Sequence, residues 1–319
     1  MKDLKVFVAG HGGMVGSSIV DNLKSKGYSN IITRTRKELD LLNQADVKSF
    51  FARENIDHVI LCAAKVGGIL ANSTYRADFI YENLEISCNI IKSSHDFGVK
   101  KLINLGSSCI YPRNSQIPIR EEYLLSGKLE QTNEPYAISK IAALKMCESF
   151  YHQYGSDFYS IMPCNLYGPR DNFNKETSHV LPALMLKIDE AKRSGSNSAS
   201  IWGTGKPLRE FLYVDDLANT ATYLLENISA EQIYSKGISH LNCGSHQEVS
   251  IFDLAHIIRD EVGFEGELVF DDSKPDGTFR KKMDNTRVAE LGINQSFLLK
   301  EGIKKTYDWY LKNILINNC

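Results

Sequence analysis

The amino-acid sequence predicts an α/β fold in which a doubly wound parallel sheet carries a smaller mixed α/β region. Three observations predict it. In the first half of the 319 residues, short apolar or β-branched runs alternate with stretches of helical periodicity. A glycine-rich turn at residues 10–16 follows the first of these runs. Around Asn165 the alternation is lost, and Pro163, Pro169 and Pro182 interrupt the chain.

The apolar runs place the strands, and the amphipathic stretches between them place the helices. Strands are expected at residues 4–9, 30–33, 58–63, 101–106 and 158–163, and helices at 14–26, 44–54, 76–97 and 135–154. A strand followed by a helix at 211–228 is expected to return to the main sheet. The chain therefore divides into a main domain, residues 1–163 plus 211–228, and a smaller domain, residues 164–210 plus 229–319.

The overall charge is close to neutral, because 37 basic and 39 acidic residues give a formal net charge of −2. We therefore expect no nucleic-acid partner and no attraction to an anionic membrane surface. No apolar run approaches the roughly 18 residues that a membrane span needs, and the first strand is charged, so a cytoplasmic protein is expected. The seven cysteines form no Cys-x-x-Cys pair and the histidines no His-x-x-x-His pair, so no disulfide framework and no metal site are expected.

The glycine turn, Gly10-His11-Gly12-Gly13-Met14-Val15-Gly16, joins the first strand to the first helix. Gly10 allows a tight turn, Gly13 lets the backbone approach a pyrophosphate, and Gly16 allows the helix to pack closely on the strand. The N-terminus of the helix then offers backbone donors and its dipole to the phosphates. This context predicts a Rossmann-type dinucleotide site, so the main domain is expected to bind the cofactor.

The end of the second strand is where such domains distinguish NAD from NADP. An acidic residue there holds the free 2′-hydroxyl of NAD, whereas arginine accommodates the 2′-phosphate of NADP. Here residues 31–33 lead into Arg34-Thr35-Arg36-Lys37, with no acid before Glu38. A solvated basic turn would have the same composition. At this position, however, the cations favour NADP(H), with Arg34 and Arg36 as the contacts to its 2′-phosphate.

The strand at 101–106 ends in Gly106-Ser107-Ser108-Cys109, and open α/β sheets bind ligands at the carboxyl ends of their strands. Tyr136 and Lys140 are four residues apart in the predicted helix 135–154, so they lie on one face. A lysine ammonium beside a phenol favours the phenolate, and the pKa of Tyr136 is therefore expected to fall toward the working pH. Such a tyrosine can exchange a proton with a carbonyl oxygen or an alcohol that Ser107 orients.

The glycine turn, Ser107 and the stretch from Tyr136 to Lys140 together resemble the extended short-chain dehydrogenase/reductase family, over essentially the whole chain. Further motifs narrow the resemblance; they lie at residues 63–69, 106–112, 133–138, 165–169, 171–173, 178–180, 209–216, 274–278 and 280–281. Such motifs are similar to those of one group within the family. That group epimerises carbons 3 and 5 and reduces carbon 4 of GDP-4-keto-6-deoxy-D-mannose, which gives GDP-L-fucose.

The resemblance implies a reductase triad of Ser107, Tyr136 and Lys140 and an epimerase pair of Cys109 and His179. Cys109 suits the base because a thiol needs only a modest lowering of its pKa to ionise near neutrality, and His179 suits the acid. GDP-sugar contacts are implied for Ser108, Asn165, Lys187, Trp202, Arg209 and Lys281. Further contacts with NADP(H) are implied for Met14, Val15, Asp40, Leu41, Ala63, Ala64, Lys140, Pro163, Asn165, Leu166 and His179. The family also implies a homodimer formed through helices 76–97 and 135–154.

Three positions depart from the pattern of that group. Gly12 stands where an arginine is frequent, so Arg34 or Arg36 must carry the preference for NADPH. Lys187 stands where an arginine is expected near the diphosphate, and a lysine makes a point-charge contact instead of a bidentate one. Cys164 stands where a threonine is expected. These departures leave open whether the sugar is a hexose or a related 4-keto-6-deoxy-heptose, and whether reduction proceeds with little epimerisation.

Two other functions are disfavoured by the same residues. A 4,6-dehydratase or 4-epimerase of this fold would retain its cofactor through the cycle, and a dehydratase needs a carboxylate just after the serine. Cys109 and Ile110 occupy those positions. A non-catalytic dinucleotide-sensing protein would not need Ser107, Tyr136 and Lys140 together. The residues therefore favour an NADP-dependent oxidoreductase that also acts as an isomerase.

Overall fold

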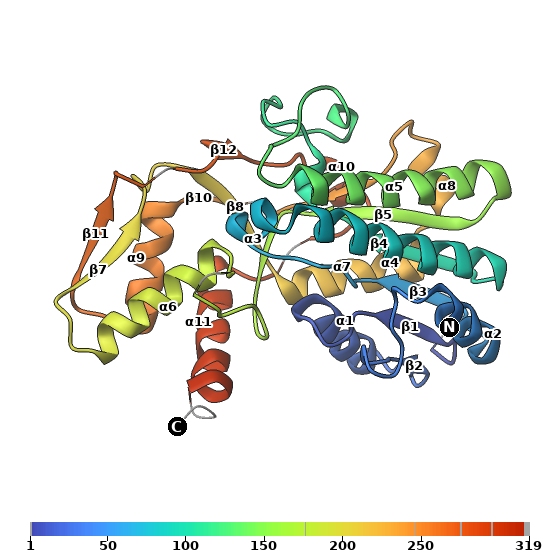
Figure 1. Ribbon diagram of the computed structural model, residues 1–319, viewed down its shortest axis with the longest axis horizontal. Helices are drawn as coiled ribbons and strands as arrows, with labels where there is room; N and C mark the ends of the chain where they lie inside the picture. Colours follow the sequence, from blue (N-terminus) through green and yellow to red (C-terminus); the bar gives the residue numbers. More distant parts are fainter. Residues whose placement is uncertain (1, 176, 246, 275, 295, 316–319) are drawn as a thin grey trace.

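The larger lobe of the computed structural model is built on a sheet of six parallel strands (Figure 1). Their order across the sheet is β2 (Ile31–Ile32), β1 (Val6–Ala9), β3 (His58–Leu61), β4 (Lys101–Leu105), β5 (Asp157–Pro163) and β9 (Leu241–Cys243). Every residue of β1 and β3 is buried, as expected of strands covered on both faces. The structure describes residues 2–175, 177–245, 247–274, 276–294 and 296–315, so Pro275 of the 274–278 motif lies outside the described residues.

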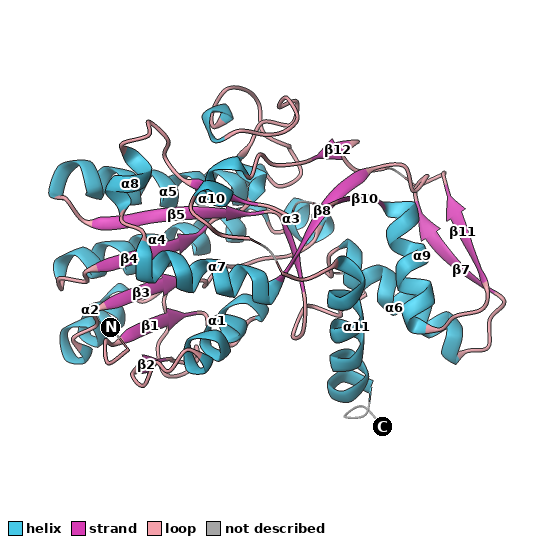
Figure 2. Cartoon of the chain, turned by 180° about the vertical axis from the view of Figure 1, so that it is seen from behind, coloured by secondary structure: helices cyan, strands magenta, loops and turns pink. Residues whose placement is uncertain are grey.

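Helices cover both faces of this sheet (Figures 1 and 2). On one face α1 (Met14–Ser25) and α7 (Val214–Asn227) pack together, and their residues Ile19, Leu23, Leu217 and Leu224 are fully buried. On the other face lie α2 (Gln44–Glu54), α4 (Arg76–Asp96) and α5 (Glu134–Tyr154). The shorter elements are α3 (Ile69–Thr74), η1 (Ser108–Ile110), η2 (Glu121–Tyr123), α8 (Ala230–Tyr234) and α10 (Thr286–Glu290).

The smaller lobe has its own sheets and its own apolar core. One sheet consists of β6 (Asn165–Tyr167), β8 (Leu208–Tyr213), β10 (Glu248–Ser250) and β12 (Arg280–Lys281), and the other pairs β7 (Ser198–Trp202) with β11 (Glu267–Asp271). Packed against them are α6 (Val180–Arg193), α9 (Ile251–Val262) and α11 (Leu299–Tyr310), which continues into the π-helical turn Leu311–Leu315. Figure 1 shows this lobe at the left, beyond the carboxyl end of the large sheet.

The predicted fold class is confirmed, and each strand and helix expected in the first 163 residues is present with ends shifted by three residues at most. The prediction that 211–228 returns to the main sheet is wrong for its strand. β8 pairs with β6, β10 and β12 in the smaller lobe, and only the helix α7 returns, to pack on α1. Instead, β9 completes the main sheet beside β5. With three residues, β9 is too short to show a hydrophobic period in the sequence.

The exact domain boundaries stay a prediction, although the pairing of β9 puts residues 241–243 on the main sheet. Within the described residues, no helix has both the length and the apolar character needed to cross a lipid bilayer.

Candidate active site

The glycine turn follows β1, at the point where the order of the strands reverses. The chain goes from β1 to β2 on one side of it and then to β3 on the other side. Gly10 has a φ of +90°, and a Cβ atom there would lie 2.6 Å from the backbone nitrogen of Ala63, just after β3. A Cβ atom at Gly16 would lie 2.2 Å from the carbonyl oxygen of Gly10. Glycine is therefore required at both positions, by the tight turn and by the close packing of α1 on β1.

Gly13 differs from these two because no protein atom crowds it. It is the N-cap of α1, and the nearest atom to its Cβ position is the Gly10 carbonyl oxygen at 3.7 Å. The first turn of α1, which begins with Met14 and Val15, contains no acidic residue. The free backbone donors and the dipole at this N-terminus fit a diphosphate, so these residues fit a dinucleotide cofactor. Contact of Gly13 with the phosphates stays a prediction, as does the role of Ala64 beside Ala63.

The two arginines expected at the 2′-phosphate differ in their surroundings. Arg34 forms an ion pair with Glu54, and its guanidinium lies 5.2 Å from the centre of the Phe50 ring. Arg36 is 74% exposed, and its Nε lies 4.0 Å from Oδ1 of Asp40. Of the two arginines, Arg36 is therefore the one whose guanidinium is more accessible to a ligand. Next to Asp40, the carbonyl of Leu41 accepts a hydrogen bond from Asn89, which fixes the backbone of this segment.

Ser107 follows β4 and is the N-cap of η1. Its Oγ accepts a hydrogen bond from the backbone N–H of Cys109 at 3.4 Å. Ser108 and Cys109 are buried in the single turn of η1, with 6% and 8% of their surfaces exposed. The segment after β4 thus places the hydroxyl of Ser107 and the thiol of Cys109 next to each other, and the prediction that they face the nicotinamide stays a prediction.

Tyr136 and Lys140 reach the same place from α5. The Lys140 ammonium donates a hydrogen bond to the carbonyl of Leu105 at 2.9 Å and lies 5.8 Å from the centre of the Tyr136 ring. Burial lowers the pKa of Lys140 to about 8. Burial also raises the pKa of Tyr136, as does the charge of Cys109, while its hydrogen-bonding neighbour Ser107 opposes the rise. The expected fall in the pKa of Tyr136 is therefore wrong, because desolvation outweighs the lowering effect of the hydrogen bond with Ser107.

Cys109 shows a similar departure from expectation. Burial raises the pKa of its thiol above the ordinary value, and the strongest opposing influence is the charge of Lys281, followed by the hydrogen bond with Ser107. The sequence analysis expected a modest lowering of the pKa of Cys109. The desolvation of the buried thiol prevents that lowering. Lys281, on β12, was expected to contact GDP. It is an electrostatic neighbour of Cys109, and burial lowers its own pKa.

His179 comes from the smaller lobe, where it is the N-cap of α6. Its side chain is accessible to solvent, and desolvation by the surrounding protein lowers its pKa. No hydrogen bond joins His179 to Cys109 or to the triad within the described parts of the chain. The structure therefore gathers Ser107, Cys109, Tyr136 and Lys140 into one cluster, while the epimerase role of His179 stays a prediction.

A second group of predicted residues lies further out on the smaller lobe. Trp202, at the end of β7, is 65% exposed, and the ammonium groups of Lys187 and Lys274 lie 4.4 and 5.9 Å from the centre of its ring system. Arg209, on β8, donates to the carbonyl of Leu208 and has its pKa lowered by burial. An exposed aromatic ring beside several cations is suited to a nucleotide base and its phosphates.

Between the two groups, the chain passes from β5 to β6 through Pro163, which is buried, and Asn165 and Leu166, which are partly buried. The Asn165 amide donates to the backbone carbonyl of Glu210 at 3.0 Å. Glu210 has no role in the sequence analysis. It is fully buried, burial raises its pKa to about 8, and its Oε1 has no hydrogen-bond partner among the described residues. In the sequence, the one indication of Glu210 was an acidic residue within the apolar stretch that follows Arg209, Arg209-Glu210-Phe211.

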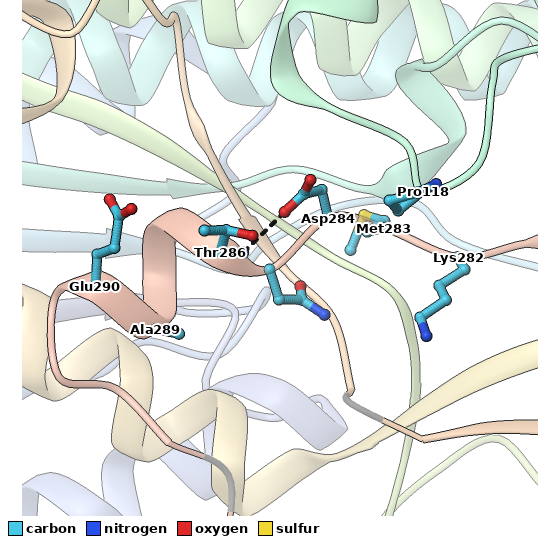
Figure 3. Close-up of a pocket in the computed structure, with 8 residues that line it drawn as sticks. Pro118, Lys282, Met283, Asp284, Thr286, Ala289 and Glu290 are labelled. Carbon is cyan, nitrogen blue, oxygen red and sulfur yellow. Dashed lines mark hydrogen bonds between the residues drawn. The ribbon is translucent and has the colours of Figure 1, made fainter.

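A cavity of about 610 Å³ lies beside α10, and it is lined by Pro118 and by residues 282–286, 289 and 290 (Figure 3). In it the backbone N–H of Thr286 donates to Asp284 at 2.9 Å. None of the lining residues is one of the predicted catalytic, cofactor or substrate residues.

Comparisons with known proteins agree with this geometry. The model of the NAD dependent epimerase/dehydratase family matches residues 6–244. The chain is 54% identical to GDP-L-fucose synthase 1 of Arabidopsis thaliana over 313 residues, which cover 98% of this chain and 95% of that relative. It is 49% identical to the GDP-L-fucose synthase of Escherichia coli (strain K12) over 317 residues, 98% of each chain. Among solved structures it is similar to GDP-mannoheptose C4 reductase of Campylobacter jejuni with NADP bound, with a TM-score of 0.90, 41% identity and coverage of 97% and 99%.

Proposed function

The chain belongs to the NAD dependent epimerase/dehydratase family, and we propose that it converts GDP-4-keto-6-deoxy-D-mannose to GDP-L-fucose as an NADPH-dependent 3,5-epimerase and 4-reductase. The observation that carries this proposal is the cluster of Ser107, Tyr136 and Lys140 with the thiol of Cys109 beside it. A reductase alone needs the first three residues. The identity of about half of all residues with GDP-L-fucose synthases, over nearly the whole chain, supports the same reaction.

Epimerisation uses the acidity that a ketone at carbon 4 gives to the hydrogens at carbons 3 and 5. We assign the removal of each proton to the thiolate of Cys109, which the charge of Lys281 stabilises. The hydroxyls of Ser107 and Tyr136 can donate to the enolate oxygen that forms. His179 then delivers a proton to the opposite face of the ring. The lowered pKa of His179 makes its protonated form scarcer near neutrality but a stronger acid.

Reduction uses the three residues of the larger lobe. NADPH held at the glycine turn of residues 10–16 would supply the hydride for carbon 4 of the sugar. Tyr136 gives its phenolic proton to the oxygen of that carbon, and Ser107 orients the oxygen. The raised pKa of Tyr136 keeps the residue protonated but makes the phenol a weaker proton donor, so the phenolate that forms must be stabilised. The ammonium of Lys140 stabilises the phenolate that remains.

We propose NADPH as the preferred cofactor, with Arg36 as the main contact to the 2′-phosphate because Arg34 is paired with Glu54. Replacing both arginines with alanine is expected to raise the KM for NADPH by roughly ten- to a hundred-fold, the worth of one or two charge-assisted hydrogen bonds, with little effect on NADH. Initial rates with each cofactor measure this. Lys37→Ala, an exposed change in the same turn, is the control. Equal increases for NADPH and NADH would contradict the assignment.

The substrate contacts are proposed for the exposed face of the smaller lobe. Trp202 with Lys187 and Lys274 suits the guanine base and the diphosphate. Arg209 and Cys109 are both electrostatic neighbours of Lys281. We also propose a cytoplasmic homodimer joined through α4 and α5. These helices pack side by side in the larger lobe, and they expose Tyr81 and Ile138, which are 61% and 42% accessible.

The proposed function is tested by incubating the protein with NADPH and GDP-4-keto-6-deoxy-D-mannose in heavy water. We expect NADPH to be consumed in proportion to the sugar, and NMR to show GDP-L-fucose with deuterium at carbons 3 and 5. A dehydratase, a 4-epimerase or a cofactor sensor would consume no NADPH. A similar solved structure is a GDP-mannoheptose C4 reductase, so a GDP-4-keto-heptose is the comparison substrate. Faster turnover of the heptose would replace the hexose in the proposal.

A further inference from the structure

The two halves of the proposed epimerase lie on different lobes, and one backbone contact joins the lobes close to His179. The backbone N–H of Gly68 donates a hydrogen bond to the carbonyl of Thr177 at 3.1 Å. A Cβ atom at Gly68 would lie 3.1 Å from the carbonyl oxygen of Ser178 and 3.3 Å from that of Thr177. Gly68 has a φ of −66°, which any residue adopts, so the close approach alone requires glycine there.

The larger lobe holds Gly68 in place through two buried asparagines. The amide of Asn72 donates to the carbonyls of Gly67 at 2.6 Å and of Gly68 at 3.0 Å. The amide of Asn83, on α4, accepts from the backbone N–H of Lys65 at 2.9 Å and donates to the carbonyl of Lys65 at 3.0 Å. Only 6% of Asn72 and 2% of Asn83 is exposed. The segment 65–68 is therefore fixed to α3 and α4 independently of its contact with the smaller lobe.

The segment that carries His179 is fixed separately to the smaller lobe. The Thr177 hydroxyl accepts a hydrogen bond from the Asn172 amide at 2.9 Å. The ring of Phe173 lies 4.8 Å from the ring of Tyr310, on α11. His179 follows as the N-cap of α6, and its carbonyl accepts from the backbone N–H of Ala183 at 3.0 Å. Figure 1 shows α3 next to the loop that leads into α6.

We propose that Gly68, held by Asn72, is a positioning residue for epimerisation: its contact with Thr177 and Ser178 sets the place of His179 relative to the cluster at Cys109. This inference rests on the proposed function. Any side chain at position 68 must push the carbonyls of residues 177 and 178 away, and His179 is the next residue. Ser107 lies between β4 and η1, and Tyr136 and Lys140 lie on α5, so the reduction step does not depend on this contact.

The test measures both activities in Gly68→Ala and Gly68→Val, with the 4-keto sugar and NADPH in heavy water. A displacement near 1 Å of a catalytic group costs about a hundred-fold, so we expect the formation of L-configured product to fall at least ten-fold in the valine variant and less in the alanine variant. Direct reduction to a D-configured deoxy sugar, and the KM for the keto sugar, are expected to stay within about two-fold.

Ser73→Ala is the matched control. Ser73 is exposed on α3 beside Asn72, and its hydroxyl donates to the carbonyl of Leu70 at 2.9 Å. Its replacement is therefore expected to keep the wild-type ratio of L- to D-configured product. Asn72→Ala removes the support of Gly68 without adding bulk, and the same shift toward D-configured product is expected. This variant keeps the test decisive if Gly68→Val folds poorly.

The inference is overturned if folded Gly68→Val or Asn72→Ala retains the wild-type product ratio. It is also overturned if both activities fall together, or if Ser73→Ala shows the same selective loss. Thermal unfolding of each variant establishes that it is folded. The wild-type protein in the same assay reports on the proposed function, and the ratio of variant to wild type reports on the Gly68 contact, so the two can fail separately.

Discussion

Replacing Cys109 with serine is expected to lower the rate of epimerisation by about two to four decades while direct reduction of the keto sugar continues. Burial already raises the pKa of the thiol, and the charge of Lys281, the hydrogen bond with Ser107 and the charge of Lys140 oppose that rise. A serine hydroxyl in the same place is a far weaker acid than a thiol. The ionised base is then almost never present.

The change leaves the reductase residues in place. Serine is close to cysteine in size, Cys109 is buried in η1, and the hydrogen bond to Ser107 comes from the backbone N–H at position 109, which the substitution keeps. Tyr136 and Lys140 approach from α5 and are unaffected. The unepimerised 4-keto sugar should therefore be reduced directly to a D-configured deoxy sugar.

The measurement is the configuration of the product and its deuterium content at carbons 3 and 5 after reaction in heavy water. Cys88→Ser, an exposed cysteine on α4, is the control and should give the wild-type product. If Cys109→Ser still gives mainly the L-configured sugar at the wild-type rate, Cys109 is only a buried spacer. The chain would then be a reductase without this epimerase base.

The clustering of the proposed catalytic groups of the larger lobe could be predicted from the sequence because it depends on local rules. The glycines of residues 10–16, the end of β4 and the four-residue spacing of Tyr136 and Lys140 each follow from the geometry of one turn, strand or helix. β8 was assigned to the wrong sheet for the opposite reason. Its apolar residues suit either sheet, and only pairing with β6, β10 and β12 decides between them.

The electrostatics of the site could not be predicted in this way. The spacing of Tyr136 and Lys140 indicates an attraction that lowers the tyrosine pKa, but the loss of water around both groups depends on the whole fold. The same holds for Cys109. Lys281, its strongest cationic influence, is 172 positions away in sequence and arrives on β12. The Gly68 contact is equally long in range, since the segments it joins are on different lobes.

Replacing Tyr136 with phenylalanine is expected to reduce the rate of NADPH oxidation by about two to four decades, the usual worth of a general acid. The aromatic ring, which meets Phe79 edge to face with ring centres 6.3 Å apart, can stay where it is. What is lost is the only proton that this residue can give to the oxygen of carbon 4. With its pKa raised by burial, wild-type Tyr136 carries the phenolic proton that the variant lacks.

Epimerisation should remain measurable in Tyr136→Phe, because Cys109 and His179 are unchanged and Ser107 can still donate to the enolate oxygen. In heavy water the variant should therefore place deuterium in the unreduced 4-keto sugar while little NADPH is consumed. Tyr154→Phe, which removes the same hydroxyl from an exposed tyrosine at the end of the same helix, should behave as wild type. Reduction by Tyr136→Phe at a rate near wild type would mean that another group supplies the proton. Loss of deuterium exchange together with reduction would instead mean that the Tyr136 hydroxyl holds the enolate as well, so that both half-reactions share one donor.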